Sequence, residues 1–318
     1  MPAYQPQEKS ALHGDLVIWG NDAIQELVDL WQQGFNRIYP DVHISTFMRS
    51  TGAAVGALYT GTAQVGVFGR EISRDELATW KRVFPYPPVS VTVASGSYNV
   101  FAKTVAVAVL VNRDNPLPAI SLEQLDALYS RDRLRGAARP IRTWGDLGLK
   151  GAWSRRPVRI YGLDEETGTA AYFRDIVMKR GHWSCALTLP PGAPRERYAG
   201  SGGDASERLV AALERDPTAI GIGGFRNTND RVRALAISET GSTPAIEGSR
   251  ASIEDRSYPL RRQIYIFVNK PPNQPWDPKV LEFLRYVLSD RGQADVRREG
   301  AFLPLPAATV VSEREKLK

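Results

Sequence analysis

The stretch that decides the fold is Tyr161-Gly162-Leu163-Asp164-Glu165-Glu166-Thr167-Gly168-Thr169-Ala170-Ala171-Tyr172-Phe173. Residues 159–162 alternate in the manner of a short strand, whereas Ala170, Phe173 and the apolar residues after them recur at helical spacing. The pattern predicts a strand, a tight loop and a helix. Thr167 can cap this helix through its hydroxyl, and the free N–H groups of the first turn then point toward whatever lies beyond it. Such a helix start favours anions, although an ordinary capped helix has the same signature.

The same succession of strand, polar loop and helix is predicted further toward the start of the chain. Strands are expected at 15–19, 42–47 and 64–68, because each is a short apolar run that ends in small or polar residues. Strands that alternate with helices indicate a parallel sheet, in which the loops at the carboxyl ends of the strands gather at one edge and bind ligands. The loops concerned are Asn21 with Asp22, Ser50 with Thr51, and Gly69 with Arg70.

Length and composition set the frame for these elements. A chain of 318 residues exceeds the usual size of one domain, so two lobes are expected. It lacks an uninterrupted apolar run of about 18 residues, so no membrane span is expected. We interpret residues 1–13 as a linker without a secretory signal, a start that an export signal removed earlier would also leave. Cys185 is the only cysteine, which excludes an intrachain disulfide and a cysteine-based metal site.

The net charge of +6 is concentrated in one segment, between Arg131 and Arg159. Nine basic residues lie there with only Asp132 and Asp146 as acids. A segment of this kind can meet phosphate groups. No helix-turn-helix, RNA-recognition or zinc-finger pattern accompanies it, so we do not expect nucleic acid as a partner. A solvated or partner-facing surface is the preferred interpretation.

The rest of the chain indicates two crossings between the lobes. Residues 89–94 and 105–111 are apolar and β-branched, which is typical of buried strands, and we interpret the second run as a crossing. Residues 239–256 are polar and irregular, and the alternating run 263–269 follows them. We therefore expect two lobes bridged near 109–112 and near 256–260.

Taken in order, these patterns resemble those of the phosphate-binding proteins of ABC transporters, the Pst-type substrate-binding proteins. Among the similar pieces are Thr143-Trp144-Gly145-Asp146-Leu147-Gly148, Thr167-Gly168-Thr169 and Phe302-Leu303-Pro304-Leu305. Each piece is weak alone, but together they follow the order of the family over residues 14–306. The remaining similar pieces are 51–66, 106–117, 121–125, 216–221 and 258–260.

The resemblance implies an α/β, two-lobe periplasmic-binding-protein fold of type II, with mostly parallel sheets covered by helices and two hinge crossovers. Lobe 1 would comprise 14–109 plus 257–318, and lobe 2 would comprise 110–256. It further implies an extracytoplasmic monomer that binds phosphate or a related oxyanion between the lobes and delivers it to the membrane subunits of an ABC transporter. No cofactor or metal is implied.

The family holds its anion with hydroxyls and N–H groups at helix starts, together with one arginine and one aspartate. The positions here that match are Asn21, Asp22, Ser50, Thr51, Thr167, Gly168 and Thr169. Two positions depart from the pattern. Leu163 stands where the family has its arginine, and Gly69-Arg70 stands where it has its aspartate.

These departures bear on charge and on ligand choice. A buried dianion needs compensating charge, which Arg70 could supply in place of the missing arginine, unless it is a surface residue paired with Glu71 or Glu76. Residues 164–166 place three acids next to the helix start, where they either interact with its dipole or repel an anion. Without the aspartate we expect either that phosphate and sulfate bind within about tenfold of each other or that the ligand is a different anion, unless Asp22 has taken over the role of the aspartate.

Two other classes of function are alternatives to a role in transport. Enzyme activity is disfavoured because the chain lacks a nucleophile elbow, a Walker loop and a paired-histidine metal motif. Its histidines, His13, His43 and His182, lie away from the gathered loops, and we interpret His43 as a core residue. The second class is a homologue that has altered or lost its ligand and acts as a sensor or partner-binding scaffold. A titration with small oxyanions distinguishes a binder from a scaffold.

Overall fold

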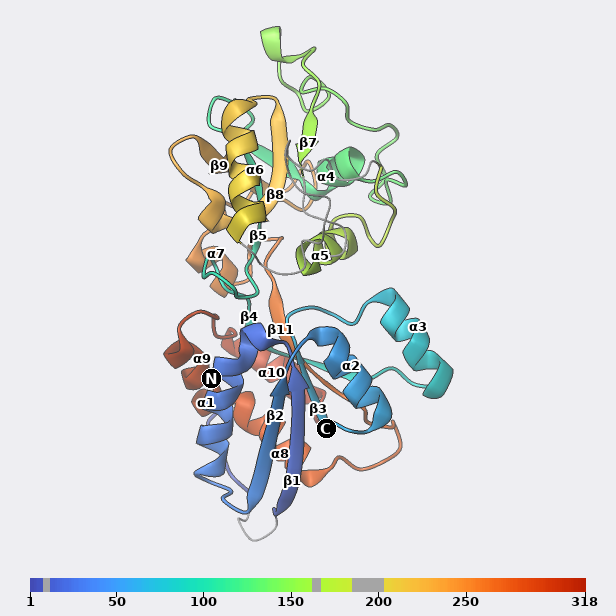
Figure 1. The fold of residues 1–318 in the computed structure, drawn as a ribbon, viewed down its shortest axis with the longest axis vertical. Coiled ribbons are helices and arrows are strands. Elements are labelled where there is room, and N and C mark those ends of the chain that lie inside the picture. Colours follow the sequence, from blue (N-terminus) through green and yellow to red (C-terminus); the bar gives the residue numbers. More distant parts are fainter. Residues whose placement is uncertain (8–11, 162–166, 185–202) are drawn as a thin grey trace. The chain divides into compact units, whose positions relative to one another are not determined.

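The computed structural model describes residues 1–7, 12–161, 167–184 and 203–318 (Figure 1). The chain divides into two compact units, Met1–Ser97 with Arg262–Lys318, and Tyr98–Arg261. It therefore passes from one unit to the other twice, after Ser97 and after Arg261. The second passage lies next to the expected 256–260, whereas the first lies before the expected 109–112, for a reason that the strand pairing of the second unit explains below.

Unit 1 is built on a five-stranded mixed sheet with the strand order β2-β1-β3-β11-β4. β1 pairs in parallel with both β2 and β3, whereas β11 runs antiparallel to both β3 and β4. All five strands lie at predicted positions. Their bounds are β1 (Gly14–Gly20), β2 (Val42–Met48), β3 (Val65–Phe68), β4 (Val89–Ser95) and β11 (Gln263–Val268).

Side-chain alternation along the strands creates a separate apolar cluster on each face of this sheet. Leu16 and Ile18 of β1 join a large cluster with α1 (Gln25–Asn36), α8 (Pro278–Val287), α9 (Asp290–Glu299) and α10 (Ala307–Glu315). Val17 and Trp19 pack on the opposite cluster, formed with α2 (Thr51–Thr60) and α3 (Arg74–Val83). Period-two burial of this kind is what a sheet covered by helices on both faces requires.

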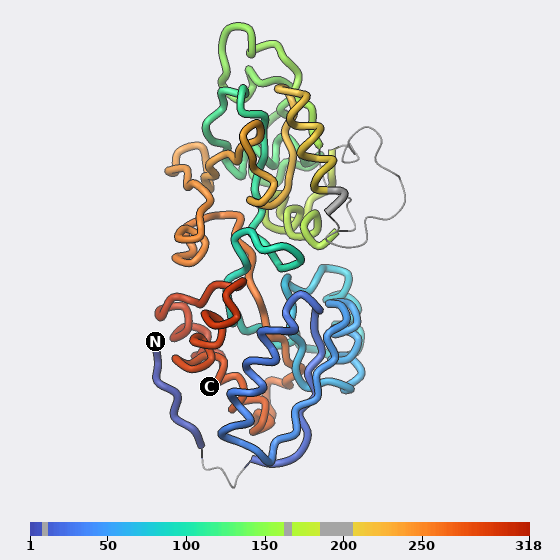
Figure 2. Tube along the Cα trace, turned by 60° about the vertical axis from the view of Figure 1, so that its left-hand side comes forward, coloured from blue at the N-terminus to red at the C-terminus, as the bar shows by residue number. Residues whose placement is uncertain are grey.

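The N-terminal segment is part of unit 1 and not the linker that we expected. The Tyr4 hydroxyl donates to Glu282 Oε1 at 2.6 Å, and the Tyr4 N–H donates to Asp290 Oδ1 at 2.9 Å. Leu12 is buried in the large cluster. The segment can be followed beside the C-terminal helices in Figure 2. Prolines and polar residues suggested a linker, but contacts with residues far along the chain hold the segment in place.

Unit 2 contains a four-stranded mixed sheet, β7-β8-β5-β9, and a two-stranded parallel sheet of β6 and β10. β7 is parallel to β8, whereas β5 is antiparallel to both β8 and β9. The larger sheet of each unit is thus mixed and not mostly parallel. The strands are β5 (Val107–Asn112), β6 (Ala119–Ser121), β7 (Arg159–Tyr161), β8 (Ala219–Gly224), β9 (Val232–Ala234) and β10 (Ala236–Ser238).

The pairing of β5 explains where the first passage lies. Because β5 exchanges hydrogen bonds with β8 and β9 along its length, it belongs wholly to unit 2, and the chain has crossed before it begins. The helices of this unit are α4 (Leu122–Tyr129), α5 (Gly168–Ile176), α6 (Gly203–Arg215) and α7 (Arg250–Glu254). Within the described ranges, no helix combines the length and apolarity needed to cross a membrane.

Candidate functional site

Three predicted loops of unit 1 meet at one edge of its sheet. Gly20 at the end of β1 lies in register with Met48 of β2 and with Val67 of β3, so the three parallel strands end level. Two backbone hydrogen bonds join the loops that follow: Asn21 N–H donates to Val67 O at 3.1 Å, and Arg49 N–H donates to Gly20 O at 2.9 Å. Parallel direction and level ends together place the loops side by side.

The second of these loops ends in the capped start of α2. Ser50 Oγ accepts from the N–H of Ala53 at 3.2 Å, which makes Ser50 the N-cap. The N–H groups of Thr51 and Gly52 have no hydrogen-bond partner in the part of the chain that the structure describes. Ser50 and Gly52 are exposed, while the Thr51 side chain is buried. This helix start therefore offers a hydroxyl and two free N–H donors.

The first loop is a smaller cap built from Asn21 and Asp22. Asn21 Oδ1 and Asp22 Oδ1 each lie 3.0 Å from the N–H of Ala23 and accept from it, at the start of the short 3-10 helix Asp22–Ile24. Asn21 is half-buried and Asp22 is exposed. Because the oxygen of Asn21 is the capping atom, its side-chain amide N–H groups are the donors left on this loop.

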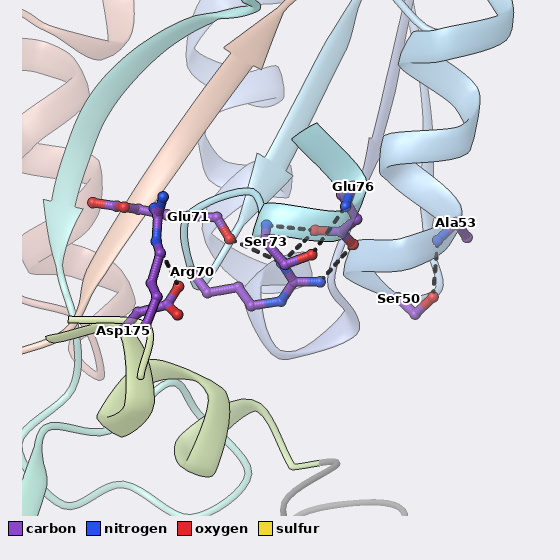
Figure 3. A network of polar contacts seen from close by, with 8 residues as sticks. Ser50, Ala53, Arg70, Glu71, Ser73, Glu76 and Asp175 are labelled. Carbon is purple, nitrogen blue, oxygen red and sulfur yellow. Dashed lines mark hydrogen bonds and ion pairs between the residues drawn. The ribbon is translucent and has the colours of Figure 1, made fainter. Parts of the chain in front are cut away.

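Arg70, in the third loop, is held in a two-point ion pair with Glu76 (Figure 3). Its Nη1 and Nη2 donate to the two carboxylate oxygens of Glu76, each at 2.7 Å, and Nη1 also donates to Glu71 O at 2.8 Å. Of the alternatives expected for Arg70, the structure thus shows the pairing with Glu76, while Glu71 contributes only its carbonyl. The charge of Arg70 is compensated in place.

Glu76 is itself fixed at the start of α3. Its Oε2 accepts from Ser73 N–H at 2.8 Å, and Ser73 Oγ accepts from Glu76 N–H at 3.3 Å, so the two residues form a capping box. Burial raises the pKa of Glu76, but the hydrogen bonds from Arg70 and Ser73 outweigh burial and leave its pKa below the ordinary value. Glu76 is therefore an ionised anchor for Arg70.

Arg262 is a residue at this edge that sequence reasoning missed. It lies just before β11, is 7% exposed, and donates from Nη2 to Gly69 O at 2.7 Å. Its own carbonyl accepts from Gly96 N–H at 2.7 Å. In the sequence Arg262 is a charged residue directly before an apolar strand, and charged residues at such positions are usually exposed. Arg262 ties the end of β3 to the strand that follows the second passage.

Unit 2 contains a second capped helix start, that of α5. β7 precedes it, and Thr167 Oγ1 accepts from Ala170 N–H at 3.2 Å, so the predicted cap and helix are confirmed. The N–H groups of Gly168 and Thr169 have no partner among the described residues. Gly168 is exposed and Thr169 is half-buried. This start has the same donor set as that of α2.

The far end of α5 is anchored by contacts that the sequence did not suggest. Arg135 donates from Nε to Val177 O at 2.7 Å and from Nη2 to Ile176 O at 2.6 Å. Phe173 is fully buried and stacks on Trp183 with ring centroids 5.9 Å apart. A cation at the carboxyl end of a helix complements its dipole, and the packed aromatic ring keeps its axis in place.

Several predicted features lie outside the described residues. They are Leu163, the acids Asp164, Glu165 and Glu166, and Cys185. Among the described residues, no cluster of His, Cys, Asp and Glu side chains could hold a metal ion. His43 is exposed on β2 and is not the core residue that we expected, because its face of this edge strand stays uncovered. His182 Nδ1 lies 2.7 Å from Asp132 Oδ2.

Comparison with known proteins agrees with this architecture over almost the whole chain. The family model described as "PBP superfamily domain" matches residues 5–291. The phosphate-binding protein PstS of Pseudomonas aeruginosa is 31% identical over 307 residues, which cover 96% of this chain and 87% of the relative. PstS of Staphylococcus aureus is 23% identical over 314 residues, covering 97% and 84%. These relatives are named as binding proteins and not as enzymes.

Two solved structures share the fold at lower identity. An ABC-type phosphate transport receptor from Vibrio cholerae has a TM-score of 0.57 at 16% identity, covering 92% of this chain and 100% of the receptor. A possible phosphate-binding protein from Planctomyces limnophilus has a TM-score of 0.54 at 20% identity, covering 96% and 98%. At such identities the likeness extends to the fold alone.

Proposed function

This chain belongs to the PBP superfamily and, within it, to the PstS-type phosphate-binding proteins, and from that membership we propose that it binds phosphate for an ABC transporter. In this proposal it is an extracytoplasmic monomer that passes its ligand to the membrane subunits. One observation carries the proposal: each unit presents a capped helix start at which two backbone N–H groups have no partner among the described residues. We propose that both helix starts donate hydrogen bonds to the anion.

The negative charge of the phosphate would not be compensated by a free arginine in this site. Because the guanidinium of Arg70 is balanced by Glu76, the pair supplies directed N–H donors but little net positive charge. The positive ends of α2 and α5 then provide most of the attraction for a desolvated phosphate. The remaining hydrogen-bond donors, and the backbone that can approach the anion, come from Asn21, Ser50, Thr51, Gly69, Thr167, Gly168 and Thr169. The first loop also contains one acid, Asp22.

Calorimetric titration of the full chain with phosphate tests this function. We expect saturable binding, which Thr169→Val should weaken by about 1–3 kcal/mol because charge-assisted donors are lost or misplaced. Thr62→Val, beyond the opposite end of α2, is the matched control and should bind as the unaltered chain does.

Two outcomes would contradict different parts of the proposal. Absence of binding to phosphate would overturn the function and favour the sensor or scaffold alternative, for which the comparisons give no support. Full affinity in Thr169→Val would leave the function standing but would remove this residue from the site.

A further inference from the structure

The positive charge of the chain is concentrated in residues 139–159, which we call the basic hairpin. These 21 residues include six basic residues and one acid, a net charge of +5 out of +6 for the whole chain. The other 297 residues therefore carry only +1. In the chain the hairpin follows α4 and ends at the first residue of β7, and both elements are labelled in Figure 1. Its basic residues are Arg139, Arg142, Lys150, Arg155, Arg156 and Arg159.

The hairpin has a fixed backbone, although it contains no long helix or strand. Val158 N–H donates to Arg142 O at 2.9 Å, and Trp144 N–H donates to Arg156 O at 3.0 Å, which pairs its two arms. Trp144 is fully buried, and its Nε1 donates to Thr218 O at 3.1 Å. The cations therefore extend from a base that is anchored to the rest of unit 2.

Most of these cations are not neutralised within the protein. Asp146 is directed inward, where its Oδ2 accepts from the N–H groups of Arg142 at 3.1 Å and Thr143 at 2.9 Å. Its other oxygen pairs with Arg139 at 3.3 Å. Arg142, Lys150 and Arg155 are exposed and have no acidic partner in the described part of the chain. A concentration of unpaired cations remains on a surface of known shape.

The character of the hairpin surface decides what kind of partner fits it. A stable protein interface needs an apolar centre that excludes water, but the large apolar side chains Trp144 and Leu147 are buried inside the hairpin. Trp153 is half-buried beneath the guanidinium of Arg156, whose central carbon lies 4.6 Å from the ring centroid. Arginine and tryptophan together suit the headgroup layer of a membrane, where charge and an amphipathic ring are both accommodated.

We propose that the basic hairpin is a docking surface for an anionic lipid membrane. Binding of this kind needs many cations near a negatively charged surface and no matching set of acids in fixed positions. Each cation near such a surface raises partitioning by about fivefold, so three unpaired cations together raise it about 125-fold. The proposal rests on the charge and surface of unit 2 and does not depend on the ligand of the chain.

Co-sedimentation of the full chain with lipid vesicles tests the proposal. We expect binding to vesicles of phosphatidylcholine with phosphatidylglycerol, little binding to phosphatidylcholine alone, and loss of binding at about 1 M salt, where the screening length is about 3 Å. Lys150→Gln with Arg155→Gln should lower the partition coefficient about 25-fold. Lys81→Gln with Arg82→Gln, which removes the same charge from an exposed face of α3, should lower it much less.

Three results would overturn the proposal. The first is equal loss of binding in the two double variants, which would show a dependence on net charge and not on the hairpin. The second is equal binding to both kinds of vesicle, which would show apolar adsorption. The third is binding to soluble polyglutamate or to duplex DNA without binding to anionic vesicles, which would assign the surface to an acidic protein or a nucleic acid. Circular dichroism of each variant verifies that it is folded.

Discussion

Unit 1 and unit 2 present similar helix starts that are positioned in different ways. In unit 1 three strands end level, and backbone hydrogen bonds from Asn21 and Arg49 join their loops. In unit 2 a single three-residue strand leads toward α5, whose position depends on the packing of Phe173 and on Arg135 at its far end. Strand register positions the helix start of unit 1, whereas side-chain packing positions that of unit 2. We therefore expect unit 2 to be the more sensitive half to changes in its core.

The largest expected effect is on the side-chain packing that positions α5 in unit 2. Phe173→Ala should destabilise unit 2 by about 3–5 kcal/mol, because a fully buried ring is replaced by a cavity. Denaturation in urea, followed with amide hydrogen exchange resolved by unit, measures the change. Phe47→Ala is the matched control in unit 1, since that ring is 43% exposed and should cost far less. Similar losses in the two variants would contradict the comparison.

The next effect concerns the ion pair of Arg70 with Glu76 in unit 1. Arg70→Gln should weaken phosphate binding by about 1.5–3 kcal/mol, because it removes charged donors and leaves Glu76 uncompensated beside the anion. Calorimetry measures the loss. Arg74→Gln, on the exposed surface of α3, is the control. If Glu76→Gln combined with Arg70→Gln recovers none of the affinity, repulsion by Glu76 is not part of the loss.

A third prediction concerns ligand selectivity, which we assign to the unit 1 edge. Since Gly69-Arg70 offers donors and no acid, phosphate and sulfate should bind within about tenfold, or about 1.4 kcal/mol. Competition titrations below and above the second pKa of phosphate, about 6, measure the ratio. A strong preference for phosphate on both sides, lost in Asp22→Asn, would show instead that Asp22 is the acceptor that rejects sulfate.

The smallest effect is the dependence of unit 1 stability on pH through Glu76. Its folded-state pKa is lowered, so its contribution is present above the unfolded pKa of about 4.3 and is lost as pH falls through the folded value. Glu76→Gln should flatten the acid limb of the stability profile of unit 1 and leave that of unit 2 unchanged. Thermal unfolding over a series of acidic buffers measures this. An equally steep acid limb in the variant would contradict it.

Local patterns predicted much of this molecule, because the interactions that create them are local. The predicted cap at Thr167 follows from a hydroxyl group placed three residues before a helical N–H, and the structure contains it. Ser50 and Ser73 cap α2 and α3 with the same spacing. The partner of Arg70 was left open between two glutamates. The partner is Glu76, because the capping box holds its carboxylate within hydrogen-bond distance of the Arg70 guanidinium.

Features that depend on distant residues were not predictable in the same way. The alternating side chains of β11 do not predict whether it runs parallel or antiparallel to its neighbours, because they suit both kinds of pairing equally well. The N-terminal segment looked like a linker because Tyr4 finds its partner Glu282 far along the chain. Buried Arg262 was missed for the same reason, since its acceptor is the carbonyl of Gly69. In each case the deciding contact links segments that are remote in sequence.

The place of β11 in the sheet also has a consequence for synthesis on the ribosome. β11 lies between β3 and β4, although all of unit 2 separates it from them in the chain. Unit 2 is continuous and can fold as it emerges, whereas β3 and β4 each keep an unpaired edge until residues 263–268 arrive. The unit that begins first is therefore completed last. During that interval its open strand edges are the part of the nascent chain most exposed to aggregation, and to capture by a chaperone.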